Sequence, residues 1–207
     1  MLDKIENIIF DLGGVILDID FKLSIDEFTK KGLKEAETIF KHEELGEIFI
    51  DLELGKISQQ QFYSIIKKYF NYDIDIEEIK FAWNALLLDY TVKRIEILKK
   101  LKQNYRTFLL SNTNIIHREC YEKLLYEKYN IKSLSCLFEK AYYSDEINLR
   151  KPDKEAFLYV KEKSKIDFEK TLFLDDFKVN TDAANNLGIK TILVSKENNL
   201  EKIFSNI

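Results

Sequence analysis

The stretch that most constrains the fold is residues 8–18, which read IIFDLGGVILD. Its first three residues do not alternate with polar ones, which predicts a strand buried on both faces. Asp11 then follows at the carboxyl end of this strand, and open α/β sheets bind ligands at that edge. Gly13 and Gly14 permit a tight turn and the close approach of another group. Asp11 is therefore either a nucleophile or metal ligand, or simply the start of an Asp-Gly turn.

The next part of the chain has apolar residues at helical spacing and no strand pattern. Gly55 is expected to end one helix, and Ser58 with Gln61 has the spacing of a capping box that begins the next. The helices are expected near 21–31, 35–54, 58–70 and 76–88. Residues 18–88 are thus predicted to form an all-helical block.

From Thr91 onward, strand and helix patterns alternate, which predicts parallel pairing in a doubly wound sheet. The strands are expected at 107–110, 138–143, 171–174 and 191–194, and the helices at 92–103, 116–129, 152–164 and 181–187. The predicted fold is an α/β core (1–17 and 89–207) with a helical cap (18–88) over one sheet edge.

Polar side chains follow the predicted strands at several places. Asp11, Ser111 and the pair Asp175-Asp176 each come directly after an apolar strand, and Lys151 precedes a helix start. Any one of these has an ordinary explanation as a turn or a helix cap. Because parallel strands end at one edge, however, we expect all of them to converge there, which favours a functional site.

Three carboxylates at one point repel each other and require a cation. Oxygen ligands favour Mg²⁺, since neither cysteine lies near and His42 and His117 fall outside the motifs. Ser111 and the amides after it are suited to donate to a phosphoryl group, and Lys151 to neutralise its charge. Asp11 is then placed to attack phosphorus and form an aspartyl-phosphate that water cleaves.

Composition narrows the class of protein. The 207 residues carry a net charge of −4, so no bulk basic surface indicates a nucleic-acid partner. Cys120 and Cys136 form neither a disulfide framework nor a metal spacing, which favours a reducing compartment. We see no signal peptide and no apolar run of about 20 residues, so we expect a cytoplasmic protein without a membrane partner. Oligomeric state cannot be read from the sequence.

Four segments, FDLGGV (10–15), LSNT (110–113), RKPD (150–153) and FLDD (173–176), resemble in order the four motifs of the haloacid dehalogenase-like (HAD) hydrolase superfamily. The helical block resembles the small cap that this superfamily inserts after its first motif. The resemblance covers essentially the whole chain and implies a Rossmann-like core. It is greatest to the glucose-1-phosphate phosphatase type of sugar phosphatase, which implies a small phosphorylated metabolite as substrate.

The resemblance also implies roles for single residues. Asp11 would be the nucleophile, Ser111 with the amide of Asn112 would hold the phosphoryl group, and Lys151 would bridge that group and Asp11. It also implies four ligands for Mg²⁺: Asp11, the carbonyl oxygen of Gly13, Asp176 and Asp175. Asn180 would lie behind these ligands.

One position departs from the superfamily's phosphatases. Most have a second Asp two residues after the nucleophile as general acid, a role worth roughly 10² to 10⁴ in rate, and here Gly13 stands there. We therefore expect a preference for leaving groups that need little protonation, such as sugar 1-phosphates, or a replacement acid from Asp18 or the cap. Cap residues that are candidates to face the substrate are Phe21, Glu53, Lys56 and Trp83.

Three other interpretations fit parts of this sequence. A metal-independent 2-haloacid dehalogenase also lacks the second Asp, but Asp175-Asp176 beside an anionic nucleophile would then be unneutralised. A catalytically impaired member that binds a phosphorylated ligand or a protein partner is supported only by Gly13. A phosphoacceptor receiver domain has its acid pair and its acceptor in the reverse order and is set aside.

Overall fold

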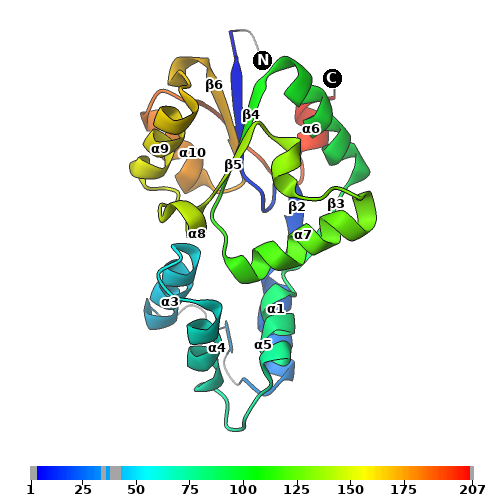
Figure 1. The fold of residues 1–207 in the computed structure, drawn as a ribbon, viewed down its shortest axis with the longest axis vertical. Coiled ribbons are helices and arrows are strands. Elements are labelled where there is room, and N and C mark those ends of the chain that lie inside the picture. Colours follow the sequence, from blue (N-terminus) through cyan, green and yellow to red (C-terminus); the bar gives the residue numbers. More distant parts are fainter. Residues whose placement is uncertain (1–3, 34–35, 38–42, 206–207) are drawn as a thin grey trace.

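A computed structural model describes residues 4–33, 36–37 and 43–205. It has a sheet-containing core and, below it, a block of helices (Figure 1). The core sheet is wholly parallel, with strand order β5-β4-β1-β6-β7. Its strands are β1 (Asn7–Phe10), β4 (Arg106–Ser111), β5 (Lys140–Tyr143), β6 (Thr171–Asp175) and β7 (Lys190–Leu193). The predicted α/β fold with a parallel sheet is confirmed.

Helices cover both faces of this sheet (Figure 1). They are α6 (Val92–Asn104), α7 (Ile115–Tyr129), α8 (Ser144–Ile147), α9 (Lys154–Ser164), α10 (Lys178–Asn186) and α11 (Leu200–Ile203). Side chains of the central strand alternate between the faces. Ile8 and Phe10 join one apolar cluster with α6 and α7, and Ile9 joins another with α9 and α10. Strand β1 is buried throughout because both faces are covered.

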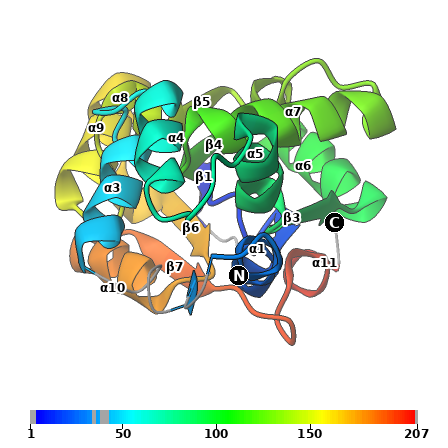
Figure 2. The ribbon, with the colours of Figure 1, turned by 90° about the horizontal axis from the view of Figure 1, so that it is seen from below.

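The block between the first strand and the rest of the core is mainly helical and has an apolar core of its own, centred on Phe28, Phe62, Ile79 and Trp83. Its helices are α1 (Phe21–Lys30), α3 (Glu43–Glu53), α4 (Gln59–Lys67) and α5 (Ile76–Asn84). Seen from below in Figure 2, these four helices lie across one end of the core. The capping box that begins α4 is present as predicted. Part of the helix expected at 35–54 lies outside the described residues.

The expectation that residues 18–88 contain no strand is wrong. Strands β2 (Leu17–Ile19) and β3 (Leu87–Tyr90) form an antiparallel ribbon where the chain enters and leaves the helical block. The expected helix at 76–88 accordingly ends at Asn84. Strands of three and four residues are too short to show a period, and their pairing joins segments far apart in sequence, so tertiary contact decides them.

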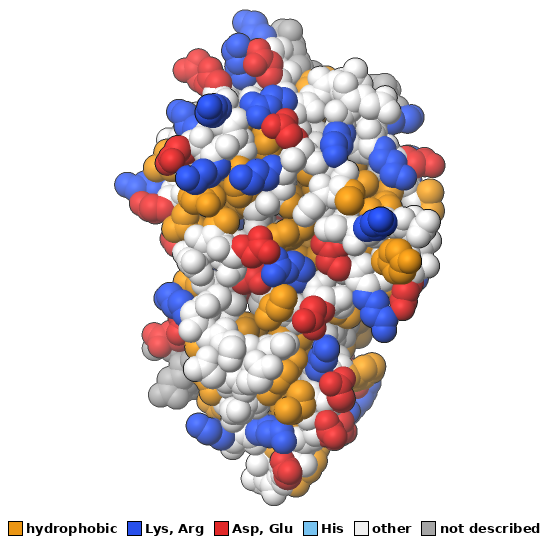
Figure 3. All heavy atoms as spheres, in the orientation of Figure 1, with side chains coloured by type: hydrophobic (Ala, Val, Ile, Leu, Met, Phe, Trp, Pro, Cys, Tyr) orange, Lys and Arg blue, Asp and Glu red, His pale blue; other side chains and the backbone are white. Residues whose placement is uncertain are grey.

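On the face shown in Figure 3, Lys and Arg side chains are interspersed with Asp and Glu over both parts of the molecule. On this face the mixture of signs is typical of the surface of a globular domain. Among the described residues, none of the helices has the length and the apolar character that a membrane crossing requires.

Candidate active site

The expected convergence of strand ends is present. Strand β1 lies between β4 and β6, so Asp11 after β1, Ser111 at the end of β4 and Asp175 at the end of β6 share one sheet edge. Oxygen atoms of Asp11, Asp175 and Asp176 all lie within 4.8 Å of one another. Residues distant in the sequence thus form one acidic cluster, as the parallel topology requires.

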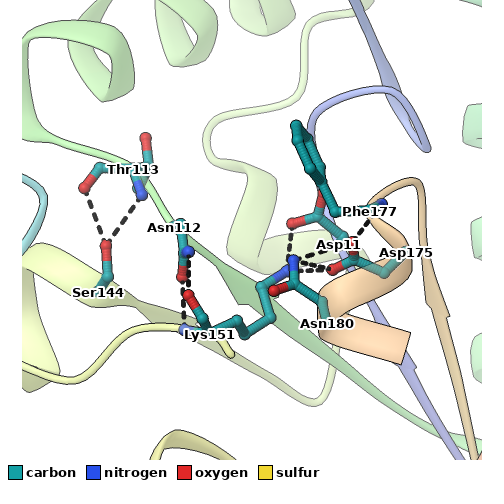
Figure 4. Close-up of polar contacts among 8 residues, drawn as sticks. All are labelled: Asp11, Asn112, Thr113, Ser144, Lys151, Asp175, Phe177 and Asn180. Carbon is teal, nitrogen blue, oxygen red and sulfur yellow. Dashed lines mark hydrogen bonds and ion pairs between the residues drawn. The ribbon is translucent and has the colours of Figure 1, made fainter. Parts of the chain in front are cut away.

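The Lys151 ammonium lies between Asp11 and Asp175 of this cluster (Figure 4). Its Nζ is 2.6 Å from Asp11 Oδ1 and 2.6 Å from Asp175 Oδ2, and the lysine side chain is only 1% exposed. Burial opposes the charged ammonium, but the two carboxylates outweigh it and raise the pKa of Lys151. Lys151 is therefore held protonated between the two strand ends.

The loop after β4 positions Lys151 through its backbone. Asn112 Nδ2 donates to the carbonyl oxygen of Lys151 at 2.8 Å, and the Lys151 amide donates to Asn112 Oδ1 at 2.9 Å. A second reciprocal pair joins Ser144 Oγ to the amide and carbonyl groups of Thr113, at 2.9 and 3.0 Å (Figure 4). The sequence pointed to the Asn112 amide alone, and the bonding of its side chain to Lys151 was missed.

Asp175 is bonded on both of its oxygens. Besides Lys151, it accepts from the Phe177 amide at 2.8 Å and from Asn180 Nδ2 at 3.0 and 3.1 Å (Figure 4). Asn180 therefore contacts the acidic cluster, as the resemblance implied. These bonds fix the orientation of Asp175 and, through it, that of the Lys151 ammonium.

Asp176 is held differently. Its Oδ1 is buried and has no hydrogen-bond partner among the described residues. On its other side lies Gly14, whose φ is +67°, and a Cβ there would be 2.2 Å from Asp176 Oδ2. Only glycine permits this approach in this backbone conformation. Asp176 thus presents a buried oxygen to which none of the described residues forms a hydrogen bond.

The acidic cluster carries more negative charge than Lys151 neutralises. Burial raises the pKa of Asp11 to about 7, with Lys151 opposing this and Asp175 adding to it. Burial and the neighbouring Asp175 raise the pKa of Asp176 to about 6. An excess of buried carboxylates, an unbonded carboxylate oxygen and oxygen-only donors together fit a hard divalent cation such as Mg²⁺.

A cavity of about 350 Å³ opens beside this cluster, between the core and the helical block. The core contributes Gly13, Ser111 and Asn112 to its wall. The full lining is Leu12, Gly13, Leu17, Ile19, Phe21, Ser24, Ile25, Phe49, Glu53, Trp83, Leu86, Leu87, Ser111, Asn112, Thr113, His117 and Tyr121. Phe21, Glu53 and Trp83, expected as candidates, are present, whereas Lys56 pairs with Asp51 at 3.1 Å outside this lining.

The structure argues against Asp18 as a substrate-binding residue or replacement acid. Leu17 and Ile19 line the cavity, so the strand alternation turns Asp18 to the opposite side of β2. There Arg94 Nη1 donates to Asp18 Oδ1 at 2.7 Å. Ile19 also packs toward Gly13, where a Cβ would lie 3.0 Å from Ile19 Cδ1. An apolar side chain thus lies beside the position of the missing acid.

His117 was placed outside the motifs by sequence, yet it lines the cavity. Its ring stacks on Trp83 with centroids 4.9 Å apart and planes at 9°, and its Nδ1 is 2.8 Å from Asn84 Oδ1. Burial lowers the pKa of His117 to about 3, so the ring is neutral near pH 7. The feature of the sequence that could have located His117 is Asn114. It is the N-cap of α7 and places His117 in the first turn of that helix.

The chain matches the haloacid dehalogenase-like hydrolase family over residues 5–188 and belongs to that family. It is 33% identical to D-ribitol-5-phosphate phosphatase from Bacteroides thetaiotaomicron, with 90% of each chain covered. A HAD family enzyme of that organism, solved in complex with magnesium and inorganic phosphate, superposes with a TM-score of 0.89 at 33% identity, covering 97% and 99% of the two chains. A HAD-like family hydrolase from Porphyromonas gingivalis gives 0.87 at 28% identity, covering 98% and 97%.

Proposed function

We propose that this protein is a Mg²⁺-dependent phosphomonoesterase acting on a small phosphorylated metabolite. The observation that carries the proposal is the cluster of Asp11, Asp175 and Asp176 around Lys151, at the edge of a cavity. Asp11, Asp176, Asp175 and the carbonyl oxygen of Gly13 are the groups suited to hold Mg²⁺. The complex of the similar HAD family enzyme from Bacteroides thetaiotaomicron with magnesium and inorganic phosphate supports a magnesium site. When bound, the cation would offset the charge of the phosphoryl oxygens.

In the proposed reaction an Asp11 carboxylate oxygen attacks phosphorus in line with the ester bond. The P–O bond to the alcohol breaks, its electron pair goes to the leaving oxygen, and that oxygen takes up a proton from water. Water then cleaves the aspartyl-phosphate and regenerates Asp11. Lys151 and Ser111 would stabilise negative charge on the transferring group. The two hydrogen bonds between Asn112 and Lys151 fix the lysine backbone, and Asp11 and Asp175 hold its ammonium group.

For the substrate we propose a sugar or sugar-alcohol phosphate. The relative named as a phosphatase acts on D-ribitol 5-phosphate, an ester of an acyclic sugar alcohol. Its leaving group is an ordinary alcohol, so the relative does not favour our expectation of sugar 1-phosphates. Both leaving-group types therefore belong in the test.

The test is phosphate release from ribitol 5-phosphate, glucose 1-phosphate, glucose 6-phosphate and p-nitrophenyl phosphate, with Mg²⁺ and with EDTA. We expect Mg²⁺-dependent turnover that falls below about one thousandth in Asp11→Asn. Asp182→Asn is the control, because Asp182 lies on the exposed side of α10 and, among the described residues, forms an ion pair only with Lys178. Tight phosphate binding without turnover would instead indicate an impaired member, and chloride release from 2-haloacids in EDTA would indicate a dehalogenase.

A further inference from the structure

Glu53 is exceptional among the residues that line the cavity. Within the described part of the chain it is the one Asp, Glu, Lys or Arg in that lining. The helical block otherwise supplies mostly apolar groups, namely Phe21, Ile25, Phe49, Trp83 and Leu86. A carboxylate in a wall of this kind is costly to bury and is retained where it has partners.

One partner of Glu53 is Arg150, the residue before Lys151. Arg150 Nε and Nη2 both donate to the same oxygen, Glu53 Oε2, at 3.1 and 3.0 Å. The other oxygen, Oε1, accepts no hydrogen bond from the described residues. Burial raises the pKa of Glu53, and Arg150 opposes that rise. The ion pair thus leaves one oxygen able to bond a group inside the cavity.

The backbone around Glu53 is fixed to the core. Helix α3 ends at Glu53, and the turn after it lies against α8 (Figure 1). At Gly55 the φ is +64° and a Cβ would lie 2.4 Å from the carbonyl oxygen of Asp145. Asn148 Nδ2 also donates to the Leu54 carbonyl oxygen at 2.7 Å. These contacts hold Glu53 in a defined position before any ligand binds.

We infer that Glu53 Oε1 accepts hydrogen bonds from hydroxyl groups of the substrate and so selects phosphate esters of polyhydroxylated alcohols. This inference rests on the proposed phosphatase function. A hydroxyl group donates well to a carboxylate, and the C–H groups of the same chain can lie against the apolar wall. Glu53 also disfavours a second phosphate or a carboxylate at that end of the ligand, because like charges would meet there.

The test compares Glu53→Gln with wild type on three Mg²⁺-supported substrates: ribitol 5-phosphate, n-pentyl phosphate and p-nitrophenyl phosphate. We expect kcat/KM for ribitol 5-phosphate to fall by roughly 10- to 100-fold, the value of a charge-assisted hydrogen bond. We expect both hydroxyl-free substrates to change less than about threefold. Asp51→Asn is the matched control on α3, because Asp51 pairs with Lys56 outside the cavity lining.

Equal losses on all three substrates, or no loss on any, would overturn the inference. Equal losses on the two alkyl esters but not on p-nitrophenyl phosphate would also overturn it, because Glu53 would then act as general acid. These results leave the phosphatase proposal intact as long as wild type releases phosphate. If wild type hydrolyses neither these three esters nor glucose 1-phosphate and glucose 6-phosphate, the phosphatase proposal itself fails.

Discussion

At the level of single residues, the site is organised by one buried lysine among three carboxylates. Lys151 pairs with Asp11 and Asp175, whereas one buried oxygen of Asp176 has no hydrogen-bond partner in the described part of the chain. The free-energy cost of desolvating buried charges often exceeds the gain from their attraction. This arrangement is therefore poorly explained by a contribution to stability alone. It is better explained as a cation site whose charge balance is completed on binding.

The first prediction concerns Gly14. Alanine there would bring a Cβ to 2.2 Å from Asp176 Oδ2 and 2.6 Å from its Cγ, so Asp176 must move. We expect Gly14→Ala to weaken Mg²⁺ binding and kcat/KM by more than about tenfold, since one lost ligand contact is worth at least a charge-assisted hydrogen bond. A Mg²⁺ titration of the activity measures it.

Gly188→Ala is the matched control for this prediction. Gly188 also has a positive φ, +84°, but a Cβ there meets nothing within 4 Å. Both variants carry a left-handed backbone penalty of about 1 to 2 kcal/mol, so only Gly14→Ala also displaces Asp176. If Gly14→Ala and Gly188→Ala bound Mg²⁺ with equal affinity, the proposed role of Asp176 as a ligand would be wrong.

At the level of elements, the short ribbon of β2 and β3 decides which side chains meet the substrate. It turns Leu17 and Ile19 to the cavity and Asp18 away from it. The ribbon also lies where the chain leaves and re-enters the core. We propose that residues 18–88 act as a cap domain on a core of residues 1–17 and 89–207, with its boundaries inside this ribbon.

The second prediction concerns Asp18. Its side chain is 46% exposed and pairs with Arg94. We expect Asp18→Asn to change kcat and KM by less than about twofold. We also expect a loss of at most about 1 kcal/mol in unfolding free energy, because Asp18 is half exposed and the buried Arg94 keeps its bond to Glu201. Steady-state kinetics and urea unfolding check both values. A fall in kcat confined to alkyl phosphates would restore Asp18 as the general acid.

At the level of the whole molecule, two separately packed parts meet around the cavity. Glu53 with Arg150 and Trp83 with His117 join residues of the helical block to residues of the core. Both contacts lie in or beside the cavity wall, so the organic part of a substrate would touch both parts at once. Substrate binding is therefore expected to depend on their relative placement.

The third prediction concerns pH and magnesium together. The pKa of Asp11 is about 7 in the folded protein and 3.8 in the unfolded chain. Between pH 3.8 and about 7, Asp11 therefore binds more protons in the folded state than in the unfolded state. In the metal-free protein its contribution to stability therefore falls as pH rises from about 4 to 7. Mg²⁺ binds the deprotonated form, so we expect a larger Mg²⁺-induced rise in Tm at pH 8 than at pH 6.

Thermal unfolding with Mg²⁺ and with EDTA at the two pH values measures this difference. Asp11→Asn provides the comparison, since it removes the carboxyl whose pKa is raised to about 7 and leaves an amide beside Lys151. A rise in Tm that is the same at pH 6 and pH 8 in wild type would contradict the prediction. The neutral His117, with its pKa lowered to about 3, is not expected to titrate in this range.

The sequence by itself determined the parallel core and the residues that meet at its edge. Uninterrupted apolar runs identify buried strands, and a parallel sheet brings their ends together, so Asp11, Ser111 and Asp175 followed from pattern alone. Lys151 was found through its motif, and the resemblance implied its contact with Asp11, but its bond to Asp175 was not expected. Such strands can be recognised from the local sequence, because a strand that is buried on both faces has no positions for polar residues.

Only the tertiary structure decided the ribbon of β2 and β3, the outward direction of Asp18, and the entry of Glu53 and His117 into the cavity. Each of these depends on contacts between segments far apart in the chain. A three-residue strand carries too little pattern to reveal its partner or its facing side. The side chains of a separate helical block reach the site only through the packing of that block against the core, which no local period records.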